Sequence, residues 1–229
     1  MTNEVQTPLL KRPTRLVDEV YQVIYAQLMS LKIPPGGRLS VDNLVRELGV
    51  SQTPIREALA RLESQGLVVK THLIGYSAAG QMDRDRFEQL CEMRLLIEPY
   101  AAAQAAKRLR GEDCAEIVAV NDTMQQLEGQ IDHQSYGNYA HYDGALHDLI
   151  ARASRNEILV ETLARLHTHV HLFRLHYHSR VTTSANEEHQ RIVDAICGGD
   201  AETAESEMRT HIQNSRARFL PVFADRQTK

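Results

Sequence analysis

The sequence predicts a mainly α-helical protein with one small β-hairpin near its N-terminal end. Three observations support this fold class. Apolar residues recur at helical spacing both before residue 66 and from about residue 81 onward. No window in that second region alternates between apolar and polar residues as a half-buried strand would. Between the two regions, Val68-Val69-Lys70 and Gly75-Tyr76-Ser77 frame a short hairpin.

The first of these regions opens with an amphipathic helix and a sharp stop. Residues 16–31 carry apolar side chains at helical spacing, and the run Pro34-Pro35-Gly36-Gly37 ends this helix. Ser40 is a suitable N-cap for a second helix over 41–48. Residues 1–13 hold two prolines and few large apolar groups, so we expect a flexible arm there.

A third helix follows a tight break at Gly49-Val50. Its apolar face consists of Ile55, Ala58, Leu59 and Leu62. Two helices joined by a tight break and followed by a hairpin make a winged helix-turn-helix, which we place at residues 14–78. In such a domain the start of the later helix enters the DNA major groove, and the hairpin is the wing.

Polar residues at that helix start and on the wing are the candidate DNA contacts. Arg56 lies one turn into the helix, where it can reach a base edge or a phosphate. The full set of candidates is Arg38, Arg46, Ser51, Gln52, Thr53, Arg56, His72 and Gly75. Plainer roles remain open: Thr53-Pro54 can be only a helix start, and the arginines at 38 and 46 can be only solvated surface charges.

The motifs in this region resemble those of the GntR family of bacterial transcription regulators. The matching pieces are PPGGRLS, LGVSQTPIREAL and RLESQGLV. The resemblance implies a homodimer that binds a pseudo-palindromic double-stranded DNA operator. Two positions depart from the common pattern, because Gln52 and Asp42 stand where relatives often carry arginine. Glutamine can bond adenine through two hydrogen bonds, so the usual operator core should not be assumed.

Charge is divided unevenly along the chain. The formal net charge is −4, but residues 1–78 hold nine Lys/Arg against seven Asp/Glu, whereas the remainder is acidic. The small basic excess therefore lies where DNA binding is expected. The three cysteines form no CxxC pair, and we expect reduced thiols in a cytoplasmic protein. The N-terminus lacks a signal-peptide pattern, and no apolar run is long enough to span a membrane.

The apolar pattern of the second region, from about residue 81 onward, predicts an all-α bundle of six or seven helices. We expect helices at about 83–109, 112–129, 135–153, 156–179, 186–198 and 200–219. This pattern resembles the ligand-sensing FCD domain of the FadR subgroup. The matching pieces are CEMRLLIEPYAAAQAA, DGALHDLIARASRNEIL and NEEHQRIVDAICGGDAETAESEMRTHI. The resemblance implies that residues 79–229 form a metal- and ligand-binding, dimerising domain.

The same pieces contain a candidate set of metal ligands. Asp143 and His147 lie four residues apart, on one face of a helix. His189 and His211 follow on later helices, and all four fall on the metal-ligand positions of the family. One carboxylate with three imidazoles suits a divalent ion such as Zn²⁺ or Ni²⁺. Taken alone, the Asp143/His147 pair can be a surface ion pair, and His211 can be a satisfied buried histidine.

Three further residues are candidate effector contacts. Arg94 lies on a partly buried stripe, and the family resemblance implies that it helps hold a small organic acid beside the metal. An internal salt bridge to Glu98, four residues on, is the alternative for Arg94. His171 and Arg174 belong to the run HTHVHLFRLHYH, whose histidines can either line the sensor cavity or lie on the surface of one helix.

The function predicted from the sequence is a ligand-responsive transcription regulator of the repressor type, not an enzyme. A small carboxylate would bind at the metal of the C-terminal domain and change operator affinity. Two alternatives remain open. The metal can be structural in a domain that only dimerises, or the Asp/His₃ ion can serve a metal-dependent enzyme.

Overall fold

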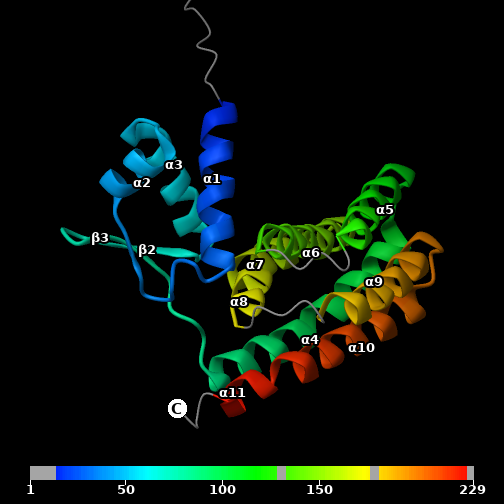
Figure 1. Ribbon diagram of the computed structural model, residues 1–229. Helices are drawn as coiled ribbons and strands as arrows, with labels where there is room; N and C mark the ends of the chain where they lie inside the picture. Colours follow the sequence, from blue (N-terminus) through cyan, green and yellow to red (C-terminus); the bar gives the residue numbers. More distant parts are fainter. Residues whose placement is uncertain (1–13, 128–132, 176–180, 226–229) are drawn as a thin grey trace, which may run out of the picture.

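The computed structural model describes residues 14–127, 133–175 and 181–225, which fold into two helical domains (Figure 1). The winged helix-turn-helix is built from α1 (Thr14–Met29), β1 (Arg38–Leu39), α2 (Val41–Leu48), α3 (Gln52–Ser64), β2 (Val68–Thr71) and β3 (Gly75–Ala78). The predicted fold class is therefore confirmed for this part. The arm predicted at residues 1–13 lies outside the described residues.

Local chemistry explains why α2 and α3 begin and end where they do. Ser40 caps α2, because its hydroxyl accepts a hydrogen bond from the Asn43 backbone N–H. Gly49 ends α2 in the left-handed region, at φ +66°, which favours glycine. The buried face of α3 consists of Pro54, Ile55, Ala58, Leu59 and Leu62. Both predictions made from the sequence, the cap and the break, are confirmed.

The hairpin forms as predicted, but the sheet contains one strand more. β2 and β3 pair antiparallel, with Val69 opposite Ser77. The short strand β1 pairs with the other edge of β3, with Arg38 opposite Ser77, so the sheet order is β1-β3-β2. The extra strand was not predicted, because two residues are too few to show a strand pattern.

The C-terminal domain is entirely helical within the described residues. Its elements are α4 (Arg84–Arg108), α5 (Gly111–Gln126), α6 (His133–Ala153), α7 (Glu157–Leu166), α8 (Thr168–Phe173), α9 (Val181–Cys197), α10 (Ala201–Phe219) and α11 (Pro221–Asp225). The single helix predicted over 156–179 is wrong. His167 adopts a left-handed backbone conformation with φ +47° and separates α7 from α8.

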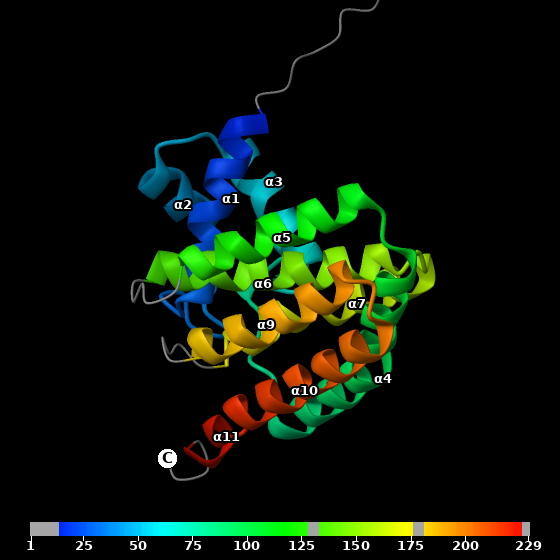
Figure 2. The same ribbon diagram turned by 90° about the vertical axis from the view of Figure 1, so that its right-hand side faces the viewer.

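Long helices pack side by side and bring distant segments together. In both views α4 and α10 run alongside each other, and α10 also packs on α9 (Figure 2). α6 packs against α4, α5, α7 and α8. α4 is continuous through Pro99, a proline inside its helical span. Segments from residues 84 to 219 therefore meet in one core.

The two domains contact each other directly. α1 packs on α6 at Gly137, where an added Cβ would lie 3.8 Å from the Ala26 Cα and 3.9 Å from the Tyr25 ring. Buried apolar residues of the two domains belong to one continuous cluster. Because this contact joins α1 to the helix that carries Asp143 and His147, a change at either place can reach the other.

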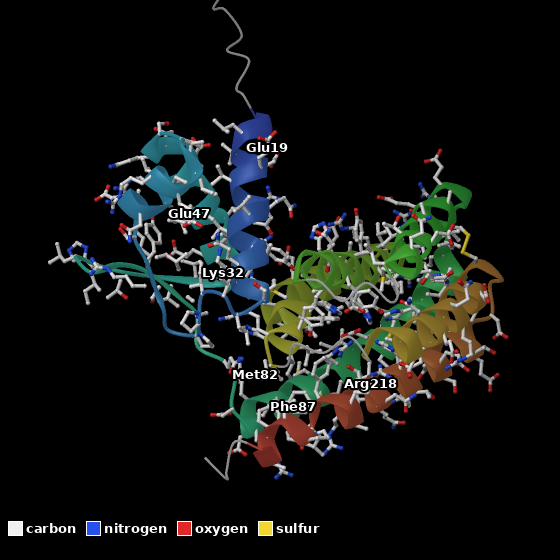
Figure 3. The ribbon with its side chains drawn as sticks, in the orientation of Figure 1. Glu19, Lys32, Glu47, Met82, Phe87 and Arg218 are labelled. Atoms are coloured by element: carbon white, nitrogen blue, oxygen red, sulfur yellow. A yellow bond between two sulfur atoms is a disulfide. The ribbon has the colours of Figure 1, made fainter. Side chains whose placement is uncertain are left out.

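The expectation of three reduced thiols is wrong for two of the cysteines. Cys114 at the start of α5 and Cys197 at the end of α9 form a disulfide, with their Cα atoms 5.6 Å apart (Figure 3). Cys91 is a buried free thiol. The sequence could not pair residues 83 positions apart. None of the helices within the described residues combines the length and the hydrophobicity of a membrane-spanning segment.

Candidate metal centre and DNA-binding surface

The start of α3 presents an exposed polar surface. Ser51, Gln52, Thr53 and Arg56 are all exposed there. Gln52 Nε2 donates to Asp42 Oδ1 on α2 at 3.0 Å, and Arg56 Nη2 lies 3.4 Å from Gln52 Oε1. The two residues that depart from the family pattern, Asp42 and Gln52, are therefore hydrogen-bonded to each other.

The remaining candidate DNA contacts lie on α2 and the sheet. Arg46 is exposed on α2 and donates to Asn43 Oδ1, and Arg38 is exposed on β1. His72 lies in the exposed turn of the wing, and the exposed Gly75, with φ +109°, begins β3 directly after that turn. Figure 1 shows the hairpin extending away from the helices. The roles of these residues in DNA binding remain predictions.

The four predicted metal ligands meet in the interior of the C-terminal domain. Asp143 and His147 come from α6, His189 from α9 and His211 from α10, and all four are buried. Ring nitrogens of the three histidines lie within 4.8 Å of one another. Asp143 Oδ1 lies 3.3 Å from His189 Nε2. Because Asp143 and His147 are four residues apart, they lie on the same face of α6, and both side chains point toward the same centre.

Two buried glutamates orient the histidines. Glu98 Oε2 on α4 lies 2.5 Å from His147 Nδ1, and Glu188 Oε2 on α9 lies 2.8 Å from His211 Nδ1. A carboxylate on the far nitrogen of a metal-binding histidine fixes the ring and raises its basicity. Glu188 also accepts a two-pronged hydrogen bond from Arg218, at 2.7 and 2.8 Å.

The remaining ring nitrogens fit a metal ion. His147 Nε2 and both ring nitrogens of His189 are buried and have no hydrogen-bond partner in the described structure. Burial lowers the pKa of His211 to about 4, although its hydrogen bond to Glu188 opposes this shift. Burial, reinforced by His211, also lowers the pKa of His189. Neutral imidazoles with free nitrogens are the form that binds a metal.

His169 on α8 belongs to the same cluster and was not predicted as part of it. Its Nδ1 contacts Asp143 Oδ2 at 2.5 Å, and donor atoms of His169, Asp143 and His147 lie within 4.8 Å of one another. Burial alone would raise the pKa of Asp143, but His169 and His189 hold it well below its ordinary value. The sequence could not predict this contact, because His169 is one of several closely spaced histidines in the run HTHVHLFRLHYH.

Arg94 makes the internal salt bridge that the sequence offered as an alternative. Its Nε donates to Glu98 Oε1 at 2.7 Å, and the side chains of Arg94 and Glu98 are 1% and 4% exposed. Burial alone would raise the pKa of Glu98, but Arg94 and then His147 lower it well below its ordinary value. Arg94 therefore supports His147 through Glu98, and its contact with an effector stays a prediction.

Two of the cavities in the described part of the chain adjoin the metal-ligand residues and share no lining residue. A void of about 20 Å³ is lined by Arg94, Asp143, His211 and Arg218, among others. A cavity of about 370 Å³ is lined by Glu98, His147 and His169 together with residues of α1, α3, α7 and the α7–α8 junction. The larger space therefore lies between the metal-ligand residues and the winged helix.

His171 and Arg174, the other effector candidates, lie apart from these metal-ligand groups. His171 lines a separate cavity of about 530 Å³ with Arg86 and Arg165. The buried Arg174 guanidinium donates to the Ala79 carbonyl, at 2.7 Å, in the segment between β3 and α4. Their contact with an effector stays a prediction. His176 and His178 lie outside the described residues.

Comparisons with known proteins agree with this two-part organisation. The model of the FCD domain matches residues 89–214, and the model of the bacterial regulatory proteins of the gntR family matches residues 16–75. The HTH-type transcriptional regulator LutR of Bacillus subtilis (strain 168) is 30% identical over 205 residues, covering 80% of this chain and 91% of LutR. The chain belongs to the GntR family of bacterial regulatory proteins, with an FCD domain.

Other GntR-type proteins support the same assignment. The Uxu operon transcriptional regulator of Escherichia coli (strain K12) is 28% identical over 225 residues, covering 87% of this chain and 86% of that protein. The structure of E. coli McbR/YncC has the same fold, with a TM-score of 0.67 at 22% identity over 93% of this chain and 99% of that chain. This GntR-family chain is thus a transcription regulator of the DNA-binding type and not an enzyme.

Proposed function

We propose that this protein is a transcriptional repressor whose affinity for its operator is controlled by a small carboxylate bound at a divalent metal ion. The observation that carries the proposal is the set of buried imidazole nitrogens without partners at His147 and His189. Leaving such groups unpaired is costly in a protein interior. A bound cation would satisfy them.

Asp143, His147, His189 and His211 are the residues that would hold this ion, with Zn²⁺ or Ni²⁺ as the candidates. His169 either supplements them or orients Asp143. When bound, the ion would supply a positive charge that attracts a carboxylate oxygen. The chain's own contribution is to hold the imidazoles neutral and oriented, through Glu98 and Glu188.

A homodimer is part of the proposal, because a GntR-type reader needs two winged helices to bind a pseudo-palindrome. α4 carries three exposed apolar side chains at helical spacing: Met93 at 38%, Leu96 at 73% and Tyr100 at 49% exposure. Large exposed apolar groups on one helix face favour contact with another protein surface. We assign this face to the second copy of the chain. The proposal includes a cytoplasmic location, because a DNA-binding regulator works where its operator lies.

The test is fluorescence anisotropy of a labelled DNA fragment from the protein's own upstream region, at a fixed salt concentration. Zinc-loaded protein is titrated onto the DNA with and without L-lactate, succinate or citrate. Asp143→Asn is compared with Asp122→Asn, a control of the same chemistry on the exposed side of α5. Metal content is measured by mass spectrometry for each variant.

We expect one of the acids to release DNA from the parent and from Asp122→Asn. Asp143→Asn should lose metal and the acid response while it still binds DNA. Binding of DNA that no acid changes, together with loss of metal and of thermal stability in Asp143→Asn, would favour a purely structural metal. Equal metal content in all three proteins would contradict the metal site.

A further inference from the structure

The cavity of about 370 Å³ is built by both domains. The winged helix contributes Tyr21 and Tyr25 from α1 and Ser64 and Gln65 from the end of α3. The C-terminal domain contributes His147 from α6 and residues from α7 and α8. A volume above 300 Å³ is in the range of small-molecule sites. The space is therefore large enough for a ligand that contacts both domains at once.

Two buried polar atoms among the residues that line this cavity have no partner. His147 Nε2 is one, and the hydroxyl of Thr168, a residue 5% exposed at the start of α8, is the other. An unpaired buried hydroxyl is unfavourable unless a ligand or water completes its hydrogen bonds. His147 Nε2 is one of the nitrogens assigned above to the metal ion, so the Thr168 hydroxyl is the atom that favours a polar ligand in this space.

The other side of the metal-ligand residues has too little room for an acid. The void beside Arg94 and Arg218 measures about 20 Å³, which is enough for about one water molecule. Arg94 there is already paired with Glu98, and Arg218 with Glu188. Of these two spaces in the described structure, the one that faces the winged helix is large enough for an organic acid.

Tyr25 is the residue of the winged helix best placed to sense what this cavity holds. It is 5% exposed, and its ring packs on Tyr21 and His141. Burial, together with the charges of Tyr21 and Asp143, raises the pKa of Tyr25, so its hydroxyl keeps its proton and can donate a hydrogen bond. Tyr25 and His147 line the same cavity, so Tyr25 lies near the metal-ligand residues.

We propose that the effector binds in this interdomain cavity, and that Tyr25 of the winged helix and Thr168 of the C-terminal domain both contact it. This inference rests on the proposed function. The ligand class that fits is a small carboxylate, including hydroxy acids. Its acid group faces the histidines, and its other oxygens meet Tyr25, Thr168, Ser64 and Gln65. A ligand held by both domains fixes their relative position. In a dimer bound to its operator, this relative position is what must change for the DNA to be released.

Calorimetric titration of the zinc-loaded full-length protein with L-lactate, succinate and citrate tests the inference. Tyr25→Phe removes only a hydroxyl, and Tyr142→Phe removes the same group from a partly buried tyrosine of α6 that does not line the cavity. Thr168→Val removes the unpaired hydroxyl while it nearly keeps the side-chain shape. Metal content, melting temperature without acid and basal DNA binding are recorded for every variant.

We expect Tyr25→Phe and Thr168→Val to bind the acid about three- to tenfold more weakly, since each loses one hydrogen bond to the ligand. Tyr142→Phe should stay within about twofold of the parent. Thr168→Val should melt no lower than the parent, because an unpaired buried hydroxyl contributes nothing to folding. That separation of affinity from stability would not arise from a merely structural role.

Two results would overturn the inference, and they differ. If an acid binds the parent and releases DNA while Tyr25→Phe and Thr168→Val bind it as the parent does, the effector site lies elsewhere and the proposed function stands. If none of the three acids binds the parent or alters DNA binding, carboxylate control itself fails, and the shared cavity fails with it.

Discussion

The buried pair of Arg94 and Glu98 allows a sharp test, because the chain contains an exposed counterpart. Arg94→Met keeps much of the side-chain length but removes the cation beside a carboxylate that is 4% exposed. Removing one partner of a buried ion pair costs about 3–5 kcal/mol. Arg209 and Glu205 form a pair with the same spacing of four residues, at 3.1 Å, but both side chains are about half exposed. Arg209→Met should therefore cost only about 0.3–0.5 kcal/mol.

Thermal melting of the zinc-loaded variants measures the difference. At about 2–4 °C per kcal/mol for a chain of this size, Arg94→Met should melt roughly 6–20 °C below the parent. Arg209→Met should melt within about 2 °C of the parent. Arg94→Met should also bind zinc about 10–100-fold more weakly, since Glu98 would hold His147 less firmly. Equal melting temperatures for the two variants would refute the argument that burial determines the strength of this pair.

Three other predictions concern separate parts of the chain. Arg56→Ala should weaken operator binding by about 1–3 kcal/mol in the anisotropy assay without changing the response to acid. Gly66→Ala should destabilise more than Gly49→Ala in urea unfolding. Both glycines have positive φ, near 70°, but an added Cβ at Gly66 would lie 3.0 Å from a ring carbon at the α7–α8 junction, whereas nothing lies within 4 Å at Gly49; similar losses would argue against this contact between the domains. Reducing the Cys114–Cys197 disulfide, which links residues 83 positions apart, should lower the free energy of unfolding by about 4–5 kcal/mol, because the closed loop is opened in the unfolded chain. Thiol alkylation and mass spectrometry, with and without reductant, measure the free thiols. Three free thiols in both samples would show that the bond does not form.

Sequence patterns predicted the features that depend on local chemistry. The helix start at Ser40, the break at Gly49 and the hairpin of β2 and β3 follow from caps, glycine and alternation within a few residues. The metal-ligand set was predicted from its spacing and from the family resemblance. The structure then brings these ligands together from three helices.

Features that depend on tertiary packing were not predicted. Nothing in the run HTHVHLFRLHYH distinguishes His169, which contacts Asp143, from its neighbours. The left-handed conformation at His167 could not be predicted either, because the leucine, histidine and threonine at this point fit one continuous helix. Glu98 and Glu188 look like ordinary helical glutamates until His147 and His211 are placed beside them.

Pro99 gives α4 a mechanical property of its own. A proline within a helix removes one backbone hydrogen bond, so bending there costs less than elsewhere. Glu98, which contacts His147, directly precedes this weak point. The part of α4 before Pro99 spans 15 residues, about 22 Å, and ends at the segment leading to the wing. A bend of about 5° at Pro99 would displace that end by roughly 2 Å, so a small change in the direction of α4 beside Glu98 would move the attachment point of the wing segment.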